Sequence, residues 1–395
     1  MITPAEQTVL DLVNRDDLIK LTTSLVRARG ENPPGDEGDT VAALAAGCVQ
    51  LGLDFEAVRV EEPGRDNLSA VLAGGNGPGL LLLGHSDVVR VGEGWTVDPF
   101  GGEIRDGRIY GRGASDMKGG LAACVIAMAA LRASGVNLSG PVELAAVVDE
   151  EETGKGIHQF VTDSADTSYL ACVVAEPTDL QTIIGARGDS YLRVVVTGRA
   201  AHAGNAADGV NAIYGATAVI AEIERLHAEL TRNPHPLLGP ASWSVGEIHG
   251  GTGASIVPAE CVLMADRRLL PGEVPAEVVE DLRRRIEALG LTERGLTISA
   301  EMPMEMPAFE TPSDAPLVVA AEQALADAGG PGLPFAGWTA ACDGGFVARD
   351  LGVPTIVLGP GSVTDQAHRA DESVSIDELF TAARTYTLLA LRLLS

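Results

Sequence analysis

The sequence predicts an α/β protein. Its larger domain would be a sandwich of helices around a mostly parallel, mixed sheet, with a smaller α+β domain inserted. Short apolar runs alternate with helical patterns at first, half-polar strands follow from about residue 185, and buried apolar runs return after about residue 300. Wholly apolar strands are typical of parallel sheets covered on both faces, and polar–apolar alternation is typical of a sheet with one solvated face. We therefore expect the larger domain to comprise residues 1–184 and 300–395, and the inserted domain residues 185–299.

The elements of the larger domain follow from the spacing of its apolar residues. Leucines and alanines at intervals of three and four predict helices over residues 5–30, 38–52, 119–134, 314–328 and 375–394. Short apolar runs bounded by turn residues predict buried strands over residues 68–74, 80–85, 142–149, 171–176 and 355–359.

The inserted domain has a different pattern. Half-polar runs predict strands over residues 191–198, 242–248 and 259–268, and amphipathic stretches predict helices over residues 210–230 and 275–289. A half-exposed strand beside an amphipathic helix suits pairing across a two-fold axis, so we expect a homodimer.

Charge and composition exclude several functional classes. The chain has 28 Lys and Arg against 55 Asp and Glu, a net charge of −27, and no basic run interrupts this acidity. Such a surface repels nucleic-acid phosphates and anionic lipids, so we expect no nucleic-acid partner and no membrane. The N-terminus lacks a signal-peptide pattern, and no apolar run approaches the ~20 residues of a membrane span. Five cysteines, scattered singly, favour a reducing compartment, so we expect a cytoplasmic protein.

The first candidate site residues follow a buried strand. His85 ends the apolar run 80–85, and open α/β sheets bind their ligands at the carboxyl ends of parallel strands. Asp87 lies two residues further on, where its carboxylate can approach the imidazole and fix the tautomer of a metal-bound His85. Capping of the following turn by His85 is the alternative interpretation.

Three carboxylates lie in comparable positions. Asp116 lies in GRGASDMKGG, which lacks the GxxxxGK[ST] spacing of a phosphate loop, so the glycines are expected to let the backbone direct one carboxylate into a site. The acidic run 149–152 ends a buried strand, and its side chains diverge, so one glutamate can bind metal while its neighbour faces water; a solvated acidic face is the alternative. Glu176 ends the run ACVVAE, where a carboxylate is costly to desolvate unless it is paired or metal-bound.

His368, in the Gly-rich loop GPGSVTDQAHRADE, completes a set of two imidazoles and three carboxylates. Such ligands without a thiolate suit zinc, cobalt or manganese. Five ligands are too many for one tetrahedral ion, but they fit two ions ~3.5–4 Å apart that share one carboxylate. We therefore expect two divalent metal ions per subunit.

Several ordered motifs resemble those of the M20 metallopeptidase family. The metal-site signatures are matched by LLLLGHSDVV, YGRGASDMKGG, VVDEEETG, VVAEPTDL and GPG followed by QAHRADESV. In the inserted segment, GRAAHAG, GGTGASIVPAE and DRRLLPGE match as well. The chain is most similar to the acetylornithine deacetylase and succinyl-diaminopimelate desuccinylase branch, over essentially its whole length. The resemblance implies a catalytic larger domain and an inserted dimerisation, or lid, domain.

The resemblance also implies roles for the candidate ligands. Asp116 would bridge two metal ions, with zinc expected and cobalt or manganese as other options. One ion would be completed by His85 and Glu176, and the other by Glu151 and His368. The resemblance further implies a cis peptide between Asp116 and Met117.

The three consecutive glutamates leave an ambiguity of frame. Because the family pattern is Asp-Glu-Glu counted from the strand end, we assign Glu150 as general base and Glu151 as ligand, and we expect Glu152 to be solvated. Asp87 would orient His85.

Three residues of the inserted domain are candidates for substrate contacts. His202, in GRAAHAG, would donate to the oxyanion from the other subunit; capping of the loop before the helix 210–230 is the alternative. Arg268 resembles the arginine that binds the substrate carboxylate through its fork, and a surface salt bridge is the alternative. Ser255 stands where the desuccinylase branch usually has Asn, and the Pro that often follows the HA motif is absent, so strict desuccinylase identity is in doubt.

These expectations combine into a two-metal amidohydrolase that removes an acyl group from an N-acyl amino acid. The alternative enzyme is a metallo-exopeptidase, a carboxypeptidase or dipeptidase, using the same site. A non-enzymatic binding protein on the same fold is the alternative from another class, and the complete ligand set with Glu150 argues against it. The expected partner is therefore a small N-acyl amino acid or a dipeptide.

Overall fold

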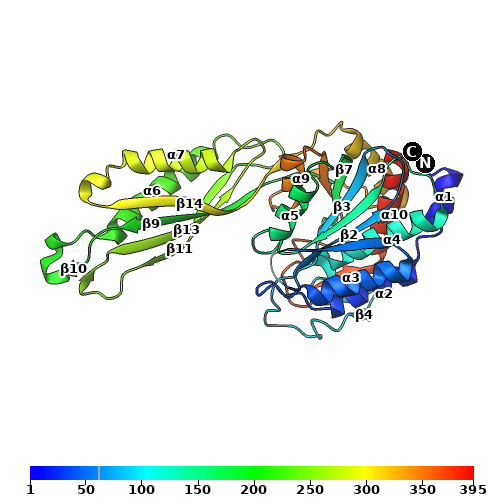
Figure 1. Ribbon diagram of the computed structural model, residues 1–395. Helices are drawn as coiled ribbons and strands as arrows, with labels where there is room; N and C mark the ends of the chain where they lie inside the picture. Colours follow the sequence, from blue (N-terminus) through cyan, green and yellow to red (C-terminus); the bar gives the residue numbers. More distant parts are fainter. Residues whose placement is uncertain (61–62) are drawn as a thin grey trace. The chain divides into compact units, whose positions relative to one another are not determined.

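The computed structural model describes residues 1–60 and 63–395, and its internal contacts divide the chain into two units (Figure 1). The first unit comprises residues 1–185, 310–337 and 343–395, and the second comprises residues 186–309 and 338–342. The predicted boundary after residue 299 falls inside β14 (Thr297–Met306), which pairs with β9 (Asp189–Thr197) along its length. The second unit therefore extends past that boundary, because a paired strand belongs with its sheet.

The first unit is built on a mixed sheet, nine-stranded among the described residues. Its main path runs β1 (Asp54–Arg59), β2 (Asp66–Leu72), β6 (Val142–Val147), β3 (Gly79–His85), β7 (Tyr169–Val174), β17 (Thr355–Val357), β8 (Ile183–Ala186) and β15 (Phe309–Glu310), with β16 (Ala336–Trp338) beside β8. The central pairs β6–β3, β3–β7 and β7–β17 are parallel. The flanking pairs β1–β2, β2–β6 and β17–β8 are antiparallel. The predicted α/β class with a mixed sheet is confirmed.

Helices cover both faces of this sheet, which explains why every residue of β3 is buried. Figure 1 shows α5 (Lys155–Asp163) and α9 (Gly344–Asp350) on one face, and α2 (Arg15–Arg27), α3 (Gly38–Leu51), α4 (Gly119–Ser134) and α10 (Ile376–Leu393) on the other. The unit also contains α1 (Pro4–Leu10) and α8 (Pro316–Ala328), and a small sheet of β4 (Glu103–Arg105), β5 (Arg108–Tyr110) and β18 (Ser373–Ser375). The stretch Ala114–Ser134 has the length and composition of a membrane span, but 89% of its most apolar window is buried in the fold.

The single helix predicted over residues 5–30 is divided into α1 and α2. Asn14 adopts an extended backbone between them, and its side-chain oxygen accepts hydrogen bonds from the amides of Asp16 and Asp17. An Asn in this position satisfies amides that lack helical partners, so it begins a new helix despite the continuous apolar spacing.

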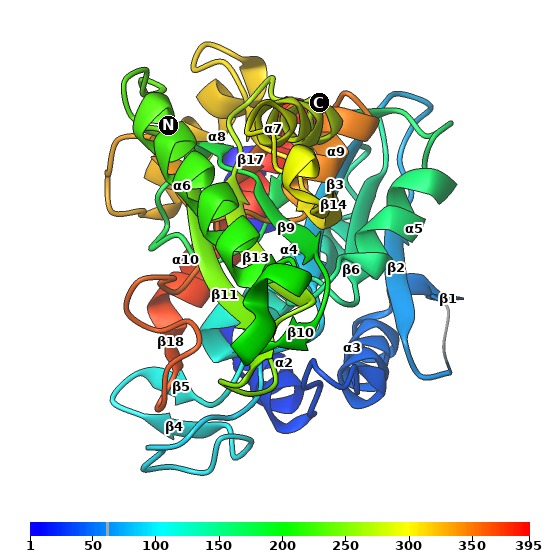
Figure 2. The same ribbon diagram turned by 90° about the vertical axis from the view of Figure 1, so that its left-hand side faces the viewer.

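The second unit is an antiparallel sheet with the strand order β11 (Ser242–Gly250), β13 (Glu260–Arg268), β9 and β14. Alternate residues of β9 and β13 are buried against α6 (Ala212–Leu230) and α7 (Pro275–Ala288), while the other residues are more exposed. Figure 2 shows α6 lying along β11 and β13, which it also contacts. The alternating pattern of these strands thus corresponds to a sheet with helices on one face.

One buried hydrogen bond ties α10 to the central sheet. Tyr386 is 1% exposed, and its hydroxyl donates to the carbonyl of Leu358, just after β17, at 2.6 Å. We expect Tyr386→Phe to lower the free energy of unfolding by about 1–3 kcal/mol, because it removes a donor from a buried carbonyl. Urea unfolding followed by circular dichroism would measure this. Tyr214→Phe, at a residue 66% exposed, is the control; equal stability of the two variants would contradict the assignment.

Candidate active site

Three neighbouring parallel strands bring His85, Glu176 and the acidic turn together. His85 ends β3 opposite Val147 of β6, and the acidic turn that contains Glu150 and Glu151 follows two residues later. Glu176 follows β7, the neighbour of β3 on its other side. Because parallel strands end at the same edge of a sheet, these side chains gather at one place, as the sequence predicted.

His85 is the centre of the first group of candidate ligands. It is 1% exposed, and its Nε2 lies 3.3 Å from Asp116 Oδ1 and 3.4 Å from Glu176 Oε1. On its other side, Nδ1 lies 3.0 Å from the carbonyl oxygen of Asp87 and 3.4 Å from the Asp87 carboxylate. Asp87 therefore fixes the ring so that Nε2 faces the other two side chains.

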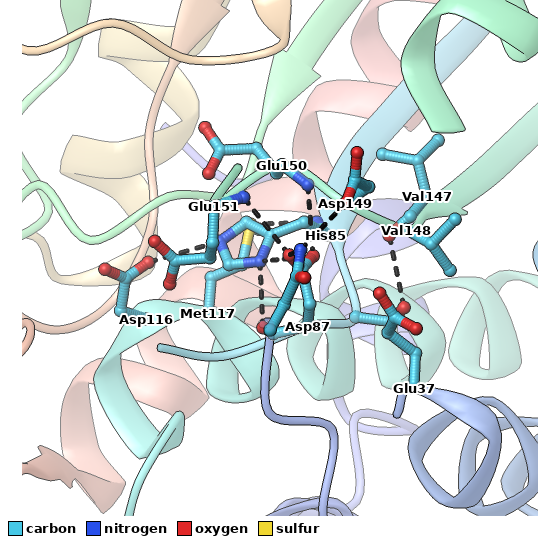
Figure 3. Close-up of polar contacts among 12 residues, drawn as sticks. Glu37, His85, Asp87, Asp116, Met117, Val147, Val148, Asp149, Glu150 and Glu151 are labelled. Carbon is cyan, nitrogen blue, oxygen red and sulfur yellow. Dashed lines mark hydrogen bonds and ion pairs between the residues drawn. The ribbon is translucent and has the colours of Figure 1, made fainter. Parts of the chain in front are cut away.

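His368 belongs to a second group that shares Asp116 with the first. Its Nε2 lies 3.3 Å from Asp116 Oδ2 and 3.2 Å from Glu151 Oε2. Asp116 thus presents one oxygen to each histidine. In each group the potential ligand atoms all lie within 4.8 Å of one another. Figure 3 shows His85, Asp116 and Glu151 converging.

Asp116 is held by a residue that the sequence reading did not identify. Glu372 is fully buried, and its carboxylate accepts hydrogen bonds from the amides of Gly113, Ser115 and Asp116 at 2.9–3.1 Å and from Arg112 Nη1 at 2.6 Å. Burial raises the pKa of Glu372 to about 7, although Arg112 opposes this shift. Glu372 lies four residues after the candidate ligand His368, and this closeness in sequence was the available sign that it belongs to the site. The predicted cis peptide between Asp116 and Met117 is present.

The acidic turn separates its consecutive glutamates. Glu151 faces His368, whereas Glu150 lies outside both candidate ligand groups, and Glu152 is exposed. Asp87 accepts hydrogen bonds from the backbone amides of Glu150 at 3.2 Å and Glu151 at 3.1 Å. This carboxylate therefore anchors the turn in addition to facing His85, as Figure 3 shows.

Against the effect of burial, hydrogen bonds to His368 and His85 hold the pKa of Asp116 well below its usual range. For the glutamates of the site, burial dominates. It raises the pKa of Glu150 well above its usual range; His85 opposes this shift, and the charge of Glu176 adds to it. It raises the pKa of Glu176 and Glu151 as well. Hydrogen bonds to Asp116 and Glu151 raise the pKa of His368 to about 10. The residues thus hold more negative charge than two imidazoles compensate, which is a setting that stabilises added cations.

The donor set fits divalent metal ions. Each group offers one imidazole nitrogen and carboxylate oxygens, the ligands that zinc, cobalt and manganese accept. Glu151 Oε1 is buried and has no hydrogen-bond partner within residues 1–60 and 63–395, so a lone pair is left for a cation.

The other predicted residues lie in the second unit. His202 and Ser255 are exposed and close together, since β10 (Ala201–His202) pairs with β12 (Ile256–Val257) and the Ser255 carbonyl accepts from the amide of Ala203 at 2.9 Å. His202 Nδ1 accepts from the amide of Gly204 at 3.0 Å, so this ring does cap the turn. Arg268 is 30% exposed and pairs with Asp189 and Asp266 at 3.2 and 2.9 Å.

Comparison with known proteins identifies the family. Residues 81–392 match the model of peptidase family M20/M25/M40. The chain is 32% identical over 352 residues to an acetylornithine deacetylase of Vibrio campbellii, covering 88% of this chain and 89% of that one. It is 33% identical over 347 residues to an acetylornithine deacetylase of Aliivibrio fischeri, covering 85% and 87%.

Solved structures share the fold. An M20 family metallo-carboxypeptidase from Sulfolobus solfataricus superposes with a TM-score of 0.75 at 20% identity, covering 94% of this chain and 97% of that one. The dipeptidase Dug1p from Saccharomyces cerevisiae superposes with a TM-score of 0.75 at 14% identity, covering 98% of each chain. The chain therefore belongs to peptidase family M20/M25/M40 and is a metal-dependent hydrolase of amide bonds.

Proposed function

We propose that the protein removes the acyl group from an N-acyl amino acid with the help of two divalent metal ions, zinc in preference to cobalt or manganese. The observation that carries this proposal is the pair of ligand groups sharing Asp116 beside the separate carboxylate of Glu150. The acetylornithine deacetylase relatives support the N-acyl amino acid as substrate class.

Each ligand group would hold one ion. The first would be bound by His85, Asp116 and Glu176, and the second by Asp116, Glu151 and His368. When bound, two divalent ions polarise an amide carbonyl and make water a stronger acid. Asp87 keeps the His85 ring oriented for its ion, and Glu372 keeps the Asp116 backbone in place.

Glu150 would move the proton. Its carboxylate would accept a proton from the attacking water and later deliver it to the departing amine. Burial raises its pKa, and a carboxylate of raised pKa is a stronger base than an exposed one. The backbone amides of Glu150 and Glu151 donate to Asp87, and these hydrogen bonds fix the turn so that the Glu150 carboxylate would serve as base and the Glu151 carboxylate as ligand.

The second unit would supply the substrate contacts. His202 would donate to the oxyanion that develops on the amide carbonyl, and Ser255 would line the acyl-group side. Arg268 would bind the substrate carboxylate with its planar fork. An exopeptidase acting on a dipeptide would use the same carboxylate contact, so the substrate itself must be tested.

A substrate panel separates the alternatives. We expect N-acetyl amino acids to release free amine faster than N-succinyl or N-formyl amino acids and dipeptides, assayed with zinc and with cobalt. Preference for dipeptides would make the protein an exopeptidase. Bound metal without release of amine from any substrate would make it a binding protein.

Glu150→Gln tests the proton transfer. We expect this variant to retain both ions and to lose about 100- to 10,000-fold in kcat, because the amide keeps the shape but does not accept the proton. Metal analysis and steady-state kinetics provide the measurement, and Glu152→Gln, at an exposed position of the same turn, is the control. Loss of an ion from Glu150→Gln would make Glu150 a ligand and shift the frame of the glutamate run.

Asp116→Ala tests the shared ligand. We expect it to weaken binding of both ions, because one carboxylate contacts both histidines. Metal content after dialysis, determined by mass spectrometry, provides the measurement. Asp365→Ala, an exposed residue in the His368 loop, is expected to keep both ions. Full retention of either ion by Asp116→Ala would rule out the bridging role.

We further propose that the protein is a cytoplasmic homodimer in which His202 completes the site of the partner subunit. The buried positions of all five cysteines support a reducing compartment. The exposure of His202 in the second unit supports a role toward another chain.

Subunit exchange tests the shared site. Glu150→Ala and His202→Ala are each expected to be inactive. In a mixed dimer, the His202→Ala chain keeps its own Glu150 and receives an intact His202 from its partner, so activity is expected to return. The measurement is amine release before and after mixing, with exchange verified by native mass spectrometry. Verified exchange without recovery would show that His202 serves its own chain.

A further inference from the structure

Five buried polar side chains form a network behind the acidic turn: Asn32, Glu37, Arg65, Asp87 and Asp149. Each is at most 7% exposed. Only Asp87 has a role in the proposed mechanism. Buried ion pairs are weak contributors to stability compared with apolar packing, so their presence directly behind a catalytic turn calls for a reason beyond stability.

Arg65 joins two carboxylates of this network. Its Nη2 donates to Glu37 Oε1 at 2.5 Å and to Asp149 Oδ1 at 2.6 Å, and its Nε donates to Glu37 Oε2 at 3.1 Å. The guanidinium therefore donates two hydrogen bonds to Glu37 and a third to Asp149. Only a planar guanidinium offers these donors in fixed directions.

Asp149 is the residue at which the chain turns from β6 toward Glu150. Its φ of +70° lies in the left-handed region, which residues other than glycine rarely adopt. Its side chain also accepts from the amide of Lys155 at 3.3 Å and from the hydroxyl of Thr153. The contacts on both carboxylate oxygens hold this unusual backbone conformation, and Glu150 is the next residue.

Asn32 connects Asp149 to Asp87, the carboxylate that accepts from the amides of the turn. Its Nδ2 donates to Asp149 Oδ1 at 3.0 Å and to Asp87 Oδ2 at 2.9 Å. Asp87 in turn accepts from the amides of Glu150 and Glu151. Arg65 is thus linked to Glu150 along the backbone through Asp149 and across hydrogen bonds through Asn32 and Asp87. Figure 3 shows Glu37, Asp87 and Asp149 around the turn.

We propose that Arg65 is a positioning residue for the hydrolysis: by gripping Glu37 and Asp149 it sets the direction of the Glu150 carboxylate. It would act without touching substrate or metal ion. Without its charge, the buried carboxylates of Glu37, Asp87 and Asp149 would repel one another more strongly, and Asp149 would lose one of the partners that hold the turn. This inference rests on the proposed role of Glu150 as general base.

Arg65→Met and Arg65→Lys test the proposal, with Arg59→Met as control. Arg59 lies in β1 and makes an exposed ion pair with Asp66 at 2.6 Å, so it controls for loss of a nearby arginine. For Arg65→Met we expect both metal ions to be retained and KM to stay within about threefold, while kcat falls about 100-fold, the effect of misplacing a reacting group by ~1 Å. Arg65→Lys restores the charge without the fork and should recover part of kcat. Arg59→Met should match the wild type.

A double-mutant cycle tests whether Arg65 acts through Glu150. If it does, adding Arg65→Met to Glu150→Gln lowers the residual kcat no further. Additive losses of kcat in the double variant would overturn the proposal. A wild-type kcat in Arg65→Met, or a loss of metal that parallels the loss of activity, would overturn it as well. If Arg65→Met does not fold, Arg65→Lys decides: wild-type kcat overturns the proposal, and reduced kcat with both ions and unchanged thermal stability supports it.

The wild-type protein separates this inference from the proposed function. If it cleaves dipeptides rather than N-acyl amino acids, the proposed substrate is wrong, and the Arg65 variants are tested on dipeptides with the same expectations. If it cleaves no amide, both proposals fail. If it is active on N-acyl amino acids and Arg65→Met is equally active, only the positioning role fails.

Discussion

The parallel pairing of β3 with β6 and β7 is the constraint on which the site depends. It places the end of β3, with His85, between the acidic turn after β6 and Glu176 after β7. Every residue of β3 is buried, so His85 at its end is almost without solvent. Its neighbours must therefore satisfy its ring nitrogens: Nδ1 faces the carbonyl oxygen and the carboxylate of Asp87, and Nε2 faces the carboxylates of Asp116 and Glu176.

Carboxylates gathered at one edge of a sheet repel one another. In this fold, cationic side chains and amide groups compensate the charge of the carboxylates that lie behind the site. Arg112 and three backbone amides compensate Glu372, which holds the Asp116 loop. Arg65 and Asn32 compensate Asp149. Beside His368, Glu151 keeps one buried oxygen without a hydrogen-bond partner within residues 1–60 and 63–395, where a cation could bind.

Much of this arrangement could be predicted from the sequence, because strand ends and short motifs are local features. The five candidate ligands and the separation of Glu150 from Glu151 needed only strand positions and the family resemblance. The division of the first predicted helix at Asn14 was missed because an apolar spacing does not reveal a cap. The roles of Glu372 and Arg65 were missed for a different reason: their partners are distant in sequence, by 256 residues for Asp116 and by 84 for Asp149. No periodicity encodes such pairs.

The two units hold the proposed functional residues in different ways. In the first unit His85, Asp87 and Glu372 are buried and fixed by several partners each, as expected where reacting groups need fixed geometry. In the second unit His202 and Ser255 are exposed on short paired segments, and the departures from the family motifs occur there. Residues with few buried partners are replaced at little cost to stability, whereas a change at Asp87 would disturb His85 and the glutamate turn together. If the proposed roles hold, substrate preference could differ between relatives while the metal chemistry stays the same, because the fold supports the two sets of side chains separately.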